Sequence, residues 1–207
     1  MAMLRKFFNQ TRKPEGILGK MMLSSMNAGH AKLAEWGLSQ LPAGTVEKAV
    51  DLGCGAGGNV GELLRKYKDA HVTGVDYSDL SVEKSKQCNR KAIEAGRCDI
   101  QSGNVADLKL PAATYDLATA FETVYFWPGL EKCFTQAARV LKPGGFFLIC
   151  NESDGRDAAG LKFETIIDGM KTYTAEEIEN ALKAAGFSAV KSEHHPSRPW
   201  IMVLARK

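Results

Sequence analysis

Residues 49–60 constrain the fold of this chain more than any other stretch. A short apolar run ends at Asp51, glycines follow on alternate positions from Gly53, and an amphipathic run begins at Val60. This order predicts a strand, a tight turn and a helix. Glycines let the backbone of the turn approach a ligand closely, and the free amides at the start of the helix face that ligand. The stretch therefore predicts a ligand site at the end of a strand in an α/β fold.

Two ligand classes fit these glycines. The spacing G-x-G-x-x-G from Gly53, with Asp76 near the distance of a ribose contact, satisfies the dinucleotide fingerprint. Asp51 favours a different ligand, because a carboxylate there repels a pyrophosphate but can hold a cationic amino group, directly or through water. The pattern Asp51-x-Gly53-x-Gly55-x-Gly57 resembles the nucleotide-binding motif of class I S-adenosylmethionine-dependent methyltransferases.

Strand and helix signals alternate along the rest of the chain. They predict strands over 48–52, 71–78, 98–105, 115–121 and 146–150, helices over 59–68, 80–95, 128–140 and, from a capping box, 174–186, and a hairpin over 189–194 and 200–205. Residues 151–170 are expected to be irregular at first and to lie over the cleft as an insertion. Strands joined through helices form parallel βαβ units.

The run Leu141-Lys142-Pro143-Gly144-Gly145, between a helix and an apolar strand, resembles the same methyltransferase family. The resemblance then covers residues 48–151. It implies an α/β fold with a seven-stranded, mostly parallel sheet, helices on both faces, a C-terminal antiparallel hairpin and an N-terminal helical lid.

Length and charge limit the alternatives. A chain of 207 residues fits a single domain, which we expect to comprise an arm and lid helices over 1–44 and a Rossmann-like core over 45–207. The net charge of +3 is too small to indicate nucleic acid. Five scattered cysteines without a C-x-x-C pair favour reduced thiols in the cytoplasm. No signal peptide or membrane span is predicted, and we expect a monomer or homodimer.

The N-terminal region has two expected parts. Residues 1–15 carry a basic excess and are expected to form a mobile arm. Helical spacing from Ile17 predicts two helices broken near 27–29. These helices either pack on the sheet or cover the ligand site as a lid, with Met26, Asn27 and His30 near the cleft.

The resemblance implies S-adenosylmethionine as cofactor and assigns its contacts. Residues that would hold the methionine end are Asp51, Gly53, Gly55 and Gly57, with Cys54 filling a small space in the turn and the Phe121 carbonyl as a further contact. Asp76, beside Tyr77, would accept both ribose hydroxyls, and it would also cap the helix that begins near Ser78. Asn104 would accept from the adenine amino group, and the Val105 amide would donate to a ring nitrogen. Many family members have Asp at position 104, and the acceptor survives that difference.

The loop over 121–128 is expected to open onto the reaction centre. Glu122 is the first candidate for a base or cation binder, followed by Tyr125, His30 and His194. Tyr125, Phe126 and Trp127 line a substrate pocket or belong to the core. The loop lacks the Asn/Asp-Pro-Pro-aromatic signature of nucleic-acid amine methylation, and His194-His195 lacks the companions of a metal site, so no metal is expected.

These observations predict a methyltransferase that acts on a small molecule by in-line displacement. Candidate catalytic residues are Glu122, Tyr125 and His30, and candidate substrate contacts are Met26, Asn27, Trp127 and His194. Three other functions remain open: an RNA methyltransferase that uses the basic arm, a non-catalytic module that senses S-adenosylmethionine, and an NAD-binding protein.

Overall fold

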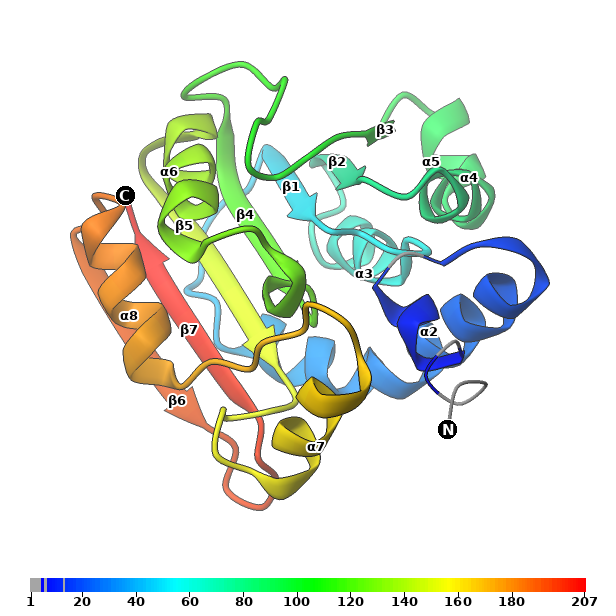
Figure 1. The fold of residues 1–207 in the computed structure, drawn as a ribbon. Helices are drawn as coiled ribbons and strands as arrows, with labels where there is room; N and C mark the ends of the chain where they lie inside the picture. Colours follow the sequence, from blue (N-terminus) through cyan, green and yellow to red (C-terminus); the bar gives the residue numbers. More distant parts are fainter. Residues whose placement is uncertain (1–4, 6, 13) are drawn as a thin grey trace.

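The computed structural model describes residues 5, 7–12 and 14–207, without the side chains at 17, 18, 20 and 23–29. Its strands are β1 (Lys48–Leu52), β2 (His71–Asp76), β3 (Cys98–Ser102), β4 (Tyr115–Phe121), β5 (Leu141–Asn151), β6 (Ala189–His194) and β7 (Ile201–Arg206). They form one sheet in the order β3-β2-β1-β4-β5-β7-β6 (Figure 1). The first five strands are parallel, and β7 runs antiparallel to β5 and β6. The predicted seven-stranded α/β sheet with a terminal hairpin is confirmed.

Helices cover both faces of this sheet. They are η1 (Asn9–Thr11), α2 (Gly16–Ser39), α3 (Gly58–Lys66), α4 (Asp79–Cys88), α5 (Arg90–Glu94), η2 (Val124–Phe126), α6 (Leu130–Val140), α7 (Ala158–Ile166) and α8 (Ala175–Ala184). One core lies under α6 and α8, and a second lies between the sheet and α2, α3 and α4 (Figure 1). Burial on both faces explains why the central strands are almost entirely apolar.

Helix α2 is continuous where two helices were predicted. A glycine inside a helix costs about 1 kcal/mol relative to alanine. Leu33, Ala34 and Leu38, later in the same helix, are buried in the second core. Burial of large apolar side chains contributes about 1.5 to 3 kcal/mol each, so packing on the sheet outweighs the local cost at Gly29.

The helix predicted over 80–95 is divided at Asn89. The Asn89 side-chain amide is buried and donates to the Gly57 carbonyl at 3.0 Å and to the Ser85 carbonyl at 3.1 Å. A polar side chain that binds the backbone of another loop competes with helix continuation. The interruption between α4 and α5 therefore ties this region to the glycine turn.

The described part of the N-terminal arm is docked, which corrects the expectation of a mobile arm. Asp168, in the loop after α7, accepts from Arg5 Nη2 at 3.1 Å and from Asn9 Nδ2 at 2.9 Å. Its amide donates to Asn9 Oδ1 at 2.8 Å, and its carbonyl accepts from Arg12 Nη1 at 3.1 Å. The segment over 151–170, expected to be irregular at first, contains α7, which Asp157 caps through the Gly160 amide.

None of the helices in the described ranges combines the length and the apolar character needed to cross a membrane.

All five cysteines are free thiols.

Candidate active site

A cavity of about 340 Å³ opens at the carboxyl ends of β1, β2 and β4. Its walls come from the glycine turn, the ends of β2 and β4, the loop after β3, the docked arm and helix α2. The carboxyl ends of parallel strands are where open α/β sheets bind their ligands. The cavity therefore lies where the sequence motif predicts a site.

The glycines of the turn have different tasks. Gly53 has φ +83°, and a Cβ there would collide with the Thr123 side chain. Gly55 has φ +52° and lines the cavity, and a Cβ there would meet no atom within 4 Å and would occupy open space. Gly57 also has positive φ, but a Cβ would strike Ser85 and Asn89 of the neighbouring helix region. Gly53 and Gly55 thus border the ligand space, whereas Gly57 allows the turn to pack on α4.

Asp51 lies beneath the turn and is 1% exposed. Its Oδ1 accepts from Thr119 Oγ1 at 2.7 Å, and its Oδ2 is buried without a hydrogen-bond partner among the described residues. Burial raises the pKa of Asp51 to about 7, the bond from Thr119 opposes that shift, and the Asp76 charge adds to it. Asp51 does not itself line the cavity, so the predicted contact with an amino group would require water or a small movement of the turn.

Asp76 lines the cavity and organises the turn. Its Oδ2 accepts from the Gly55 amide at 2.9 Å, and its Oδ1 accepts from the Ser78 amide at 2.9 Å. Burial raises its pKa, and these backbone bonds oppose the shift. The cap of α4 is Ser78, whose hydroxyl accepts from the Ser81 amide, so the expectation that Asp76 also caps this helix is wrong. The Ser81 side chain and the Tyr77 amide also lower the pKa of Asp76 through hydrogen bonds, so a donor from the cavity would share its oxygens with these partners.

The remaining predicted cofactor contacts also border the cavity. They are Cys54, Tyr77, Asn104, Val105 and Phe121. The Asn104 side-chain oxygen already accepts from the Ala106 amide at 2.9 Å, and the Tyr77 hydroxyl donates to the Arg12 carbonyl of the arm. Burial raises the pKa of the Cys54 thiol well above its ordinary value, which leaves it protonated and excludes a thiolate nucleophile there.

Glu122 begins the loop after β4 and has φ +56°. A left-handed backbone costs a residue with a Cβ about 1 to 2 kcal/mol, and such strain clusters at functional sites. Its Oε1 accepts from the Tyr125 hydroxyl at 3.1 Å and from the Glu152 amide. Burial, together with the Glu152 charge, raises the pKa of Glu122 to about 8. At neutral pH this carboxyl therefore holds a proton when no cation is near.

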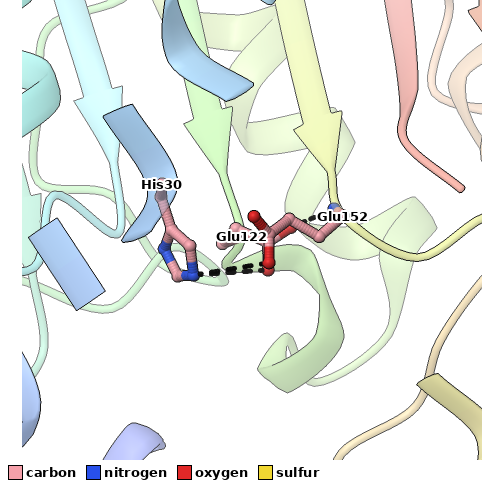
Figure 2. A group of neighbouring side chains, drawn as sticks. All are labelled: His30, Glu122 and Glu152. Atoms are coloured by element: carbon pink, nitrogen blue, oxygen red, sulfur yellow. Dashed lines mark hydrogen bonds and ion pairs between the residues drawn. The ribbon is translucent and has the colours of Figure 1, made fainter. Parts of the chain in front are cut away.

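Three side chains from distant segments converge here (Figure 2), of which His30 and Glu122 line the cavity and Glu152 does not. His30 Nε2, from α2, lies 4.0 Å from Glu122 Oε2 and 3.8 Å from Glu152 Oε2, at the end of β5. Burial lowers the pKa of His30, and burial raises the pKa of Glu152. The ligand atoms of all three lie within 4.8 Å of one another.

Gly37 explains how α2 brings His30 to this place. A Cβ at Gly37 would collide with Cys150 Sγ and would lie 3.5 Å from the Phe121 ring. The helix can therefore approach the ends of β4 and β5 closely. His30 precedes Gly37 by two helical turns and lies on the same face, so it reaches the residues that follow Phe121 and Cys150 in the strands.

The other predicted acceptor residues have different outcomes. Trp127 lines the cavity, although it is largely buried and its Nε1 donates to Thr123 Oγ1 at 3.2 Å. Tyr125 does not line the cavity, because its hydroxyl is held between Glu122 and the Ser153 amide. His194 is exposed on the edge strand β6 and does not line the cavity either. Met26 and Asn27 have side chains outside the described ones.

Sequence reasoning missed several residues of this site. Glu152 directly follows an apolar strand, as Glu122 does, and that position was a signal for it. Thr119 beneath Asp51, and Thr11, Arg12 and Pro14 of the arm at the rim of the cavity, carry no local signal of this kind.

Comparison with known proteins indicates a methyltransferase, as the sequence motifs do. Residues 50–149 match the family profile described as methyltransferase domain. The 24-methylenesterol C-methyltransferase 3 of Arabidopsis thaliana is 27% identical over 168 residues, which are 74% of this chain and 46% of that protein. The chain spans less than half the length of the curated relatives it matches.

Solved structures share the fold. A chain in the complex of the Haloferax volcanii Trm112 methyltransferase activator with a methyltransferase superposes with a TM-score of 0.80 at 17% identity, covering 89% of this chain and 92% of that one. Geranyl diphosphate C-methyltransferase from Streptomyces coelicolor superposes with a TM-score of 0.74 at 16% identity, covering 85% and 75%. The glycine motif, the strand order and these matches together support a class I, Rossmann-like S-adenosylmethionine-dependent methyltransferase.

Proposed function

We propose that this domain binds S-adenosylmethionine at the ends of β1 and β2 and directs its methyl group to a small-molecule acceptor beside Glu122. One observation supports this most strongly. The Gly55 amide and the Asp76 carboxylate are hydrogen-bonded to each other at the wall of a cavity that also contains Glu122 and His30. A turn that binds a nucleoside and a set of acid and base groups therefore share one enclosed space.

The residues fit the chemistry of this cofactor. The space beside Gly55 is open, so a ligand could approach the backbone closely there. A Cβ at this position would block that approach. Asp76 lines the cavity and is a charged acceptor for ribose hydroxyls. The unpartnered Asp51 Oδ2 is a buried acceptor beneath the turn that a cationic amino group would satisfy.

The bound cofactor would supply an electrophilic methyl group attached to a sulfonium sulfur. The part of the protein is then to align the acceptor and to exclude water. Helix α2 and the docked arm enclose the cavity. Glu122 is held from behind by the Tyr125 hydroxyl, so Tyr125 acts as a positioning residue and Glu122 as the candidate proton acceptor.

Charge at the arm favours a small molecule over RNA. Two of its basic side chains, Arg5 and Arg12, are already engaged by Asp168. We therefore propose that the arm closes the site rather than extending it along a polyanion. A strong dependence of RNA binding on salt concentration would instead favour the RNA alternative. The free thiols support our proposal of a cytoplasmic location. We also propose a monomeric or homodimeric protein without a resident metal.

The test is a calorimetric titration with S-adenosylhomocysteine, compared with NAD. We expect binding of the first and not of the second. Asp76→Ala should weaken that binding by about 2 kcal/mol, since it removes charge-assisted hydrogen bonds. An unchanged dissociation constant would remove Asp76 from the site. Transfer of labelled methyl to a panel of small nucleophiles then separates an enzyme from a sensor.

A further inference from the structure

Three acceptor atoms lie around one point at the acceptor end of the site, where His30 and Glu122 line the cavity and Glu152 does not. His30 Nε2, Glu122 Oε2 and Glu152 Oε2 come from α2, the end of β4 and the end of β5, and they face one another (Figure 2). The separations of 3.8 and 4.0 Å are too long for hydrogen bonds. None of these three atoms therefore forms a hydrogen bond with another. A hydrogen-bond donor placed between them would bind all three.

Glu122 is directed to this point by its surroundings. One of its oxygens is occupied by the Tyr125 hydroxyl and the Glu152 amide. The other oxygen accepts no hydrogen bond from a described residue and lies on the His30 side. The side chain is only 12% exposed, so water does not replace a partner as freely as it would on the surface.

The charges at this point favour a cationic ligand. Two carboxyl groups share the space with an imidazole whose pKa is lowered by burial. Asp157 adds a further negative charge near Glu122, and Tyr125 and Cys150 have raised pKa values. The Arg198 charge lowers the pKa of Glu152 and partly offsets its burial. No lysine or arginine of the described residues makes an ion pair with Glu122 or Glu152. The Phe126 and Trp127 rings also line the cavity, and aromatic faces attract cations.

We propose that the methyl acceptor is a small amine, bound as its ammonium ion by Glu122, Glu152 and His30. The inference rests on the proposed function and names the substrate class of the same site. A primary ammonium has three N–H donors, and the three acceptor atoms match that number. His30 accepts through Nε2 in the tautomer that keeps its proton on Nδ1.

Two other ligands fit less well. Tetrahedral zinc holds its ligands about 2.0 to 2.2 Å from itself and therefore about 3.3 to 3.6 Å from one another. Octahedral magnesium brings neighbouring ligands to about 2.8 to 3.0 Å, and both spacings are shorter than the 3.8 and 4.0 Å observed here. A sterol needs a large apolar pocket. The cavity of 340 Å³ is near the lower end of the range for one drug-sized ligand, and the cofactor would take much of it.

The amine, Glu122 and the cofactor together account for every bond and proton in the transfer step. The ammonium gives one proton to the Glu122 carboxylate, which leaves a lone pair on nitrogen. That lone pair forms the new N–C bond to the methyl group, while the C–S bond breaks and its electron pair stays on sulfur. The products are a methylated ammonium ion and a neutral thioether, and the proton on Glu122 passes to water.

The test titrates the protein, saturated with S-adenosylhomocysteine, with benzylamine and phenethylamine and with the alcohols of the same carbon skeletons. We expect each amine to bind about 10- to 100-fold more tightly than its alcohol, the range for a charge-assisted hydrogen bond. At pH 7 amine binding should release protons, measured in buffers of different ionisation enthalpy, because the ammonium displaces the proton from Glu122.

Glu122→Gln and Glu152→Gln should reduce the preference for amines to less than about threefold, and Glu122→Gln should abolish proton release. Glu131→Gln is the matched control, because it removes the same charge from an exposed position on α6 and should leave the preference intact. Retained affinity for S-adenosylhomocysteine shows that each variant is folded.

Three results would overturn the proposal: alcohols that bind as tightly as the amines, a preference that survives Glu122→Gln, or Mn²⁺ that binds tightly and is lost in that variant. These outcomes are distinct from failure of the proposed function. If S-adenosylhomocysteine itself does not bind, the proposed function fails. If it binds and no amine is preferred, only the acceptor class is wrong.

Discussion

The two ends of the cavity are built in different ways. At the cofactor end, Gly53, Gly55 and Asp76 belong to one βαβ unit and are linked by hydrogen bonds to backbone amides. At the acceptor end, His30 and Glu152 come from opposite parts of the chain and approach Glu122 without a hydrogen bond between side chains. The cofactor end is therefore rigid by local construction, whereas the acceptor end can be changed one side chain at a time.

The largest effect on stability is expected from a substitution in the glycine turn at the cofactor end. Gly53→Ala would place a Cβ against Thr123 in a left-handed backbone, and strain and overpacking should lower the free energy of unfolding by about 3 kcal/mol or more. Gly129→Ala is a matched control, because Gly129 has φ +90° with no atom near a Cβ. It should cost only about 1 to 2 kcal/mol. Equal losses in chemical denaturation would show that the close approach at Gly53 does not matter.

A substitution at the acceptor end should lower the rate of methyl transfer rather than the affinity for the cofactor. Glu122→Gln keeps the size of the side chain but removes the proton acceptor, so the rate of methyl transfer should fall about 100-fold. Affinity for S-adenosylhomocysteine should change less than about twofold, since Asp76 and Gly55 are untouched. Single-turnover transfer and calorimetry on the same samples measure the two quantities. A parallel loss of both would show that the two ends are not separable.

Stability should depend on pH through the acceptor end. Folding raises the pKa of Glu122 from its ordinary 4.5 to about 8, so the folded chain holds this proton more tightly than the unfolded chain does. The free energy of unfolding should then fall as pH rises from about 4.5 to 8. Asp51 contributes with the same sign only up to about 7, so the decline between pH 7 and 8 belongs to Glu122.

Glu122→Gln should remove about 1 kcal/mol of the decline between pH 7 and 8, since one titrating group contributes at most about 1.4 kcal/mol per pH unit. Denaturation at pH 6, 7 and 8 measures it. A variant whose stability declines between pH 7 and 8 as steeply as the parent would assign the slope to another group.

The smallest effect is expected where the arm closes the cavity. Asp168→Ala removes the contacts to Arg5 and Asn9, and exposed ion pairs are worth about 0 to 1 kcal/mol. We expect S-adenosylhomocysteine to dissociate only a fewfold faster, because the arm that carries Thr11 and Arg12 to the rim keeps its two hydrogen bonds to the backbone of residue 168. Asp69→Ala, in the exposed turn after α3, is the control. Equal dissociation rates in the two variants would mean that the arm does not retain the ligand.

Much of the cofactor end could be predicted because its signals are local. Strands β1 and β4 have the predicted bounds, and the capping box of Thr174 and Glu177 is formed at the start of α8. Prediction from local sequence failed where contacts between distant residues determine the structure. The continuity of α2 depends on burial of Leu33 and Leu38, and the break after α4 depends on Asn89 and the turn.

The sequence alone determined the strand order of the first βαβ unit, the glycine turn and the position of Asp76, because these follow from hydrogen bonds and dihedral preferences over a few residues. Only the tertiary structure decided that His30, Glu122 and Glu152 meet. That meeting requires α2 to cross the ends of β4 and β5 at Gly37, where Cys150 leaves no room for a side chain. A contact of this kind depends on packing between distant segments, and no short stretch of sequence specifies it.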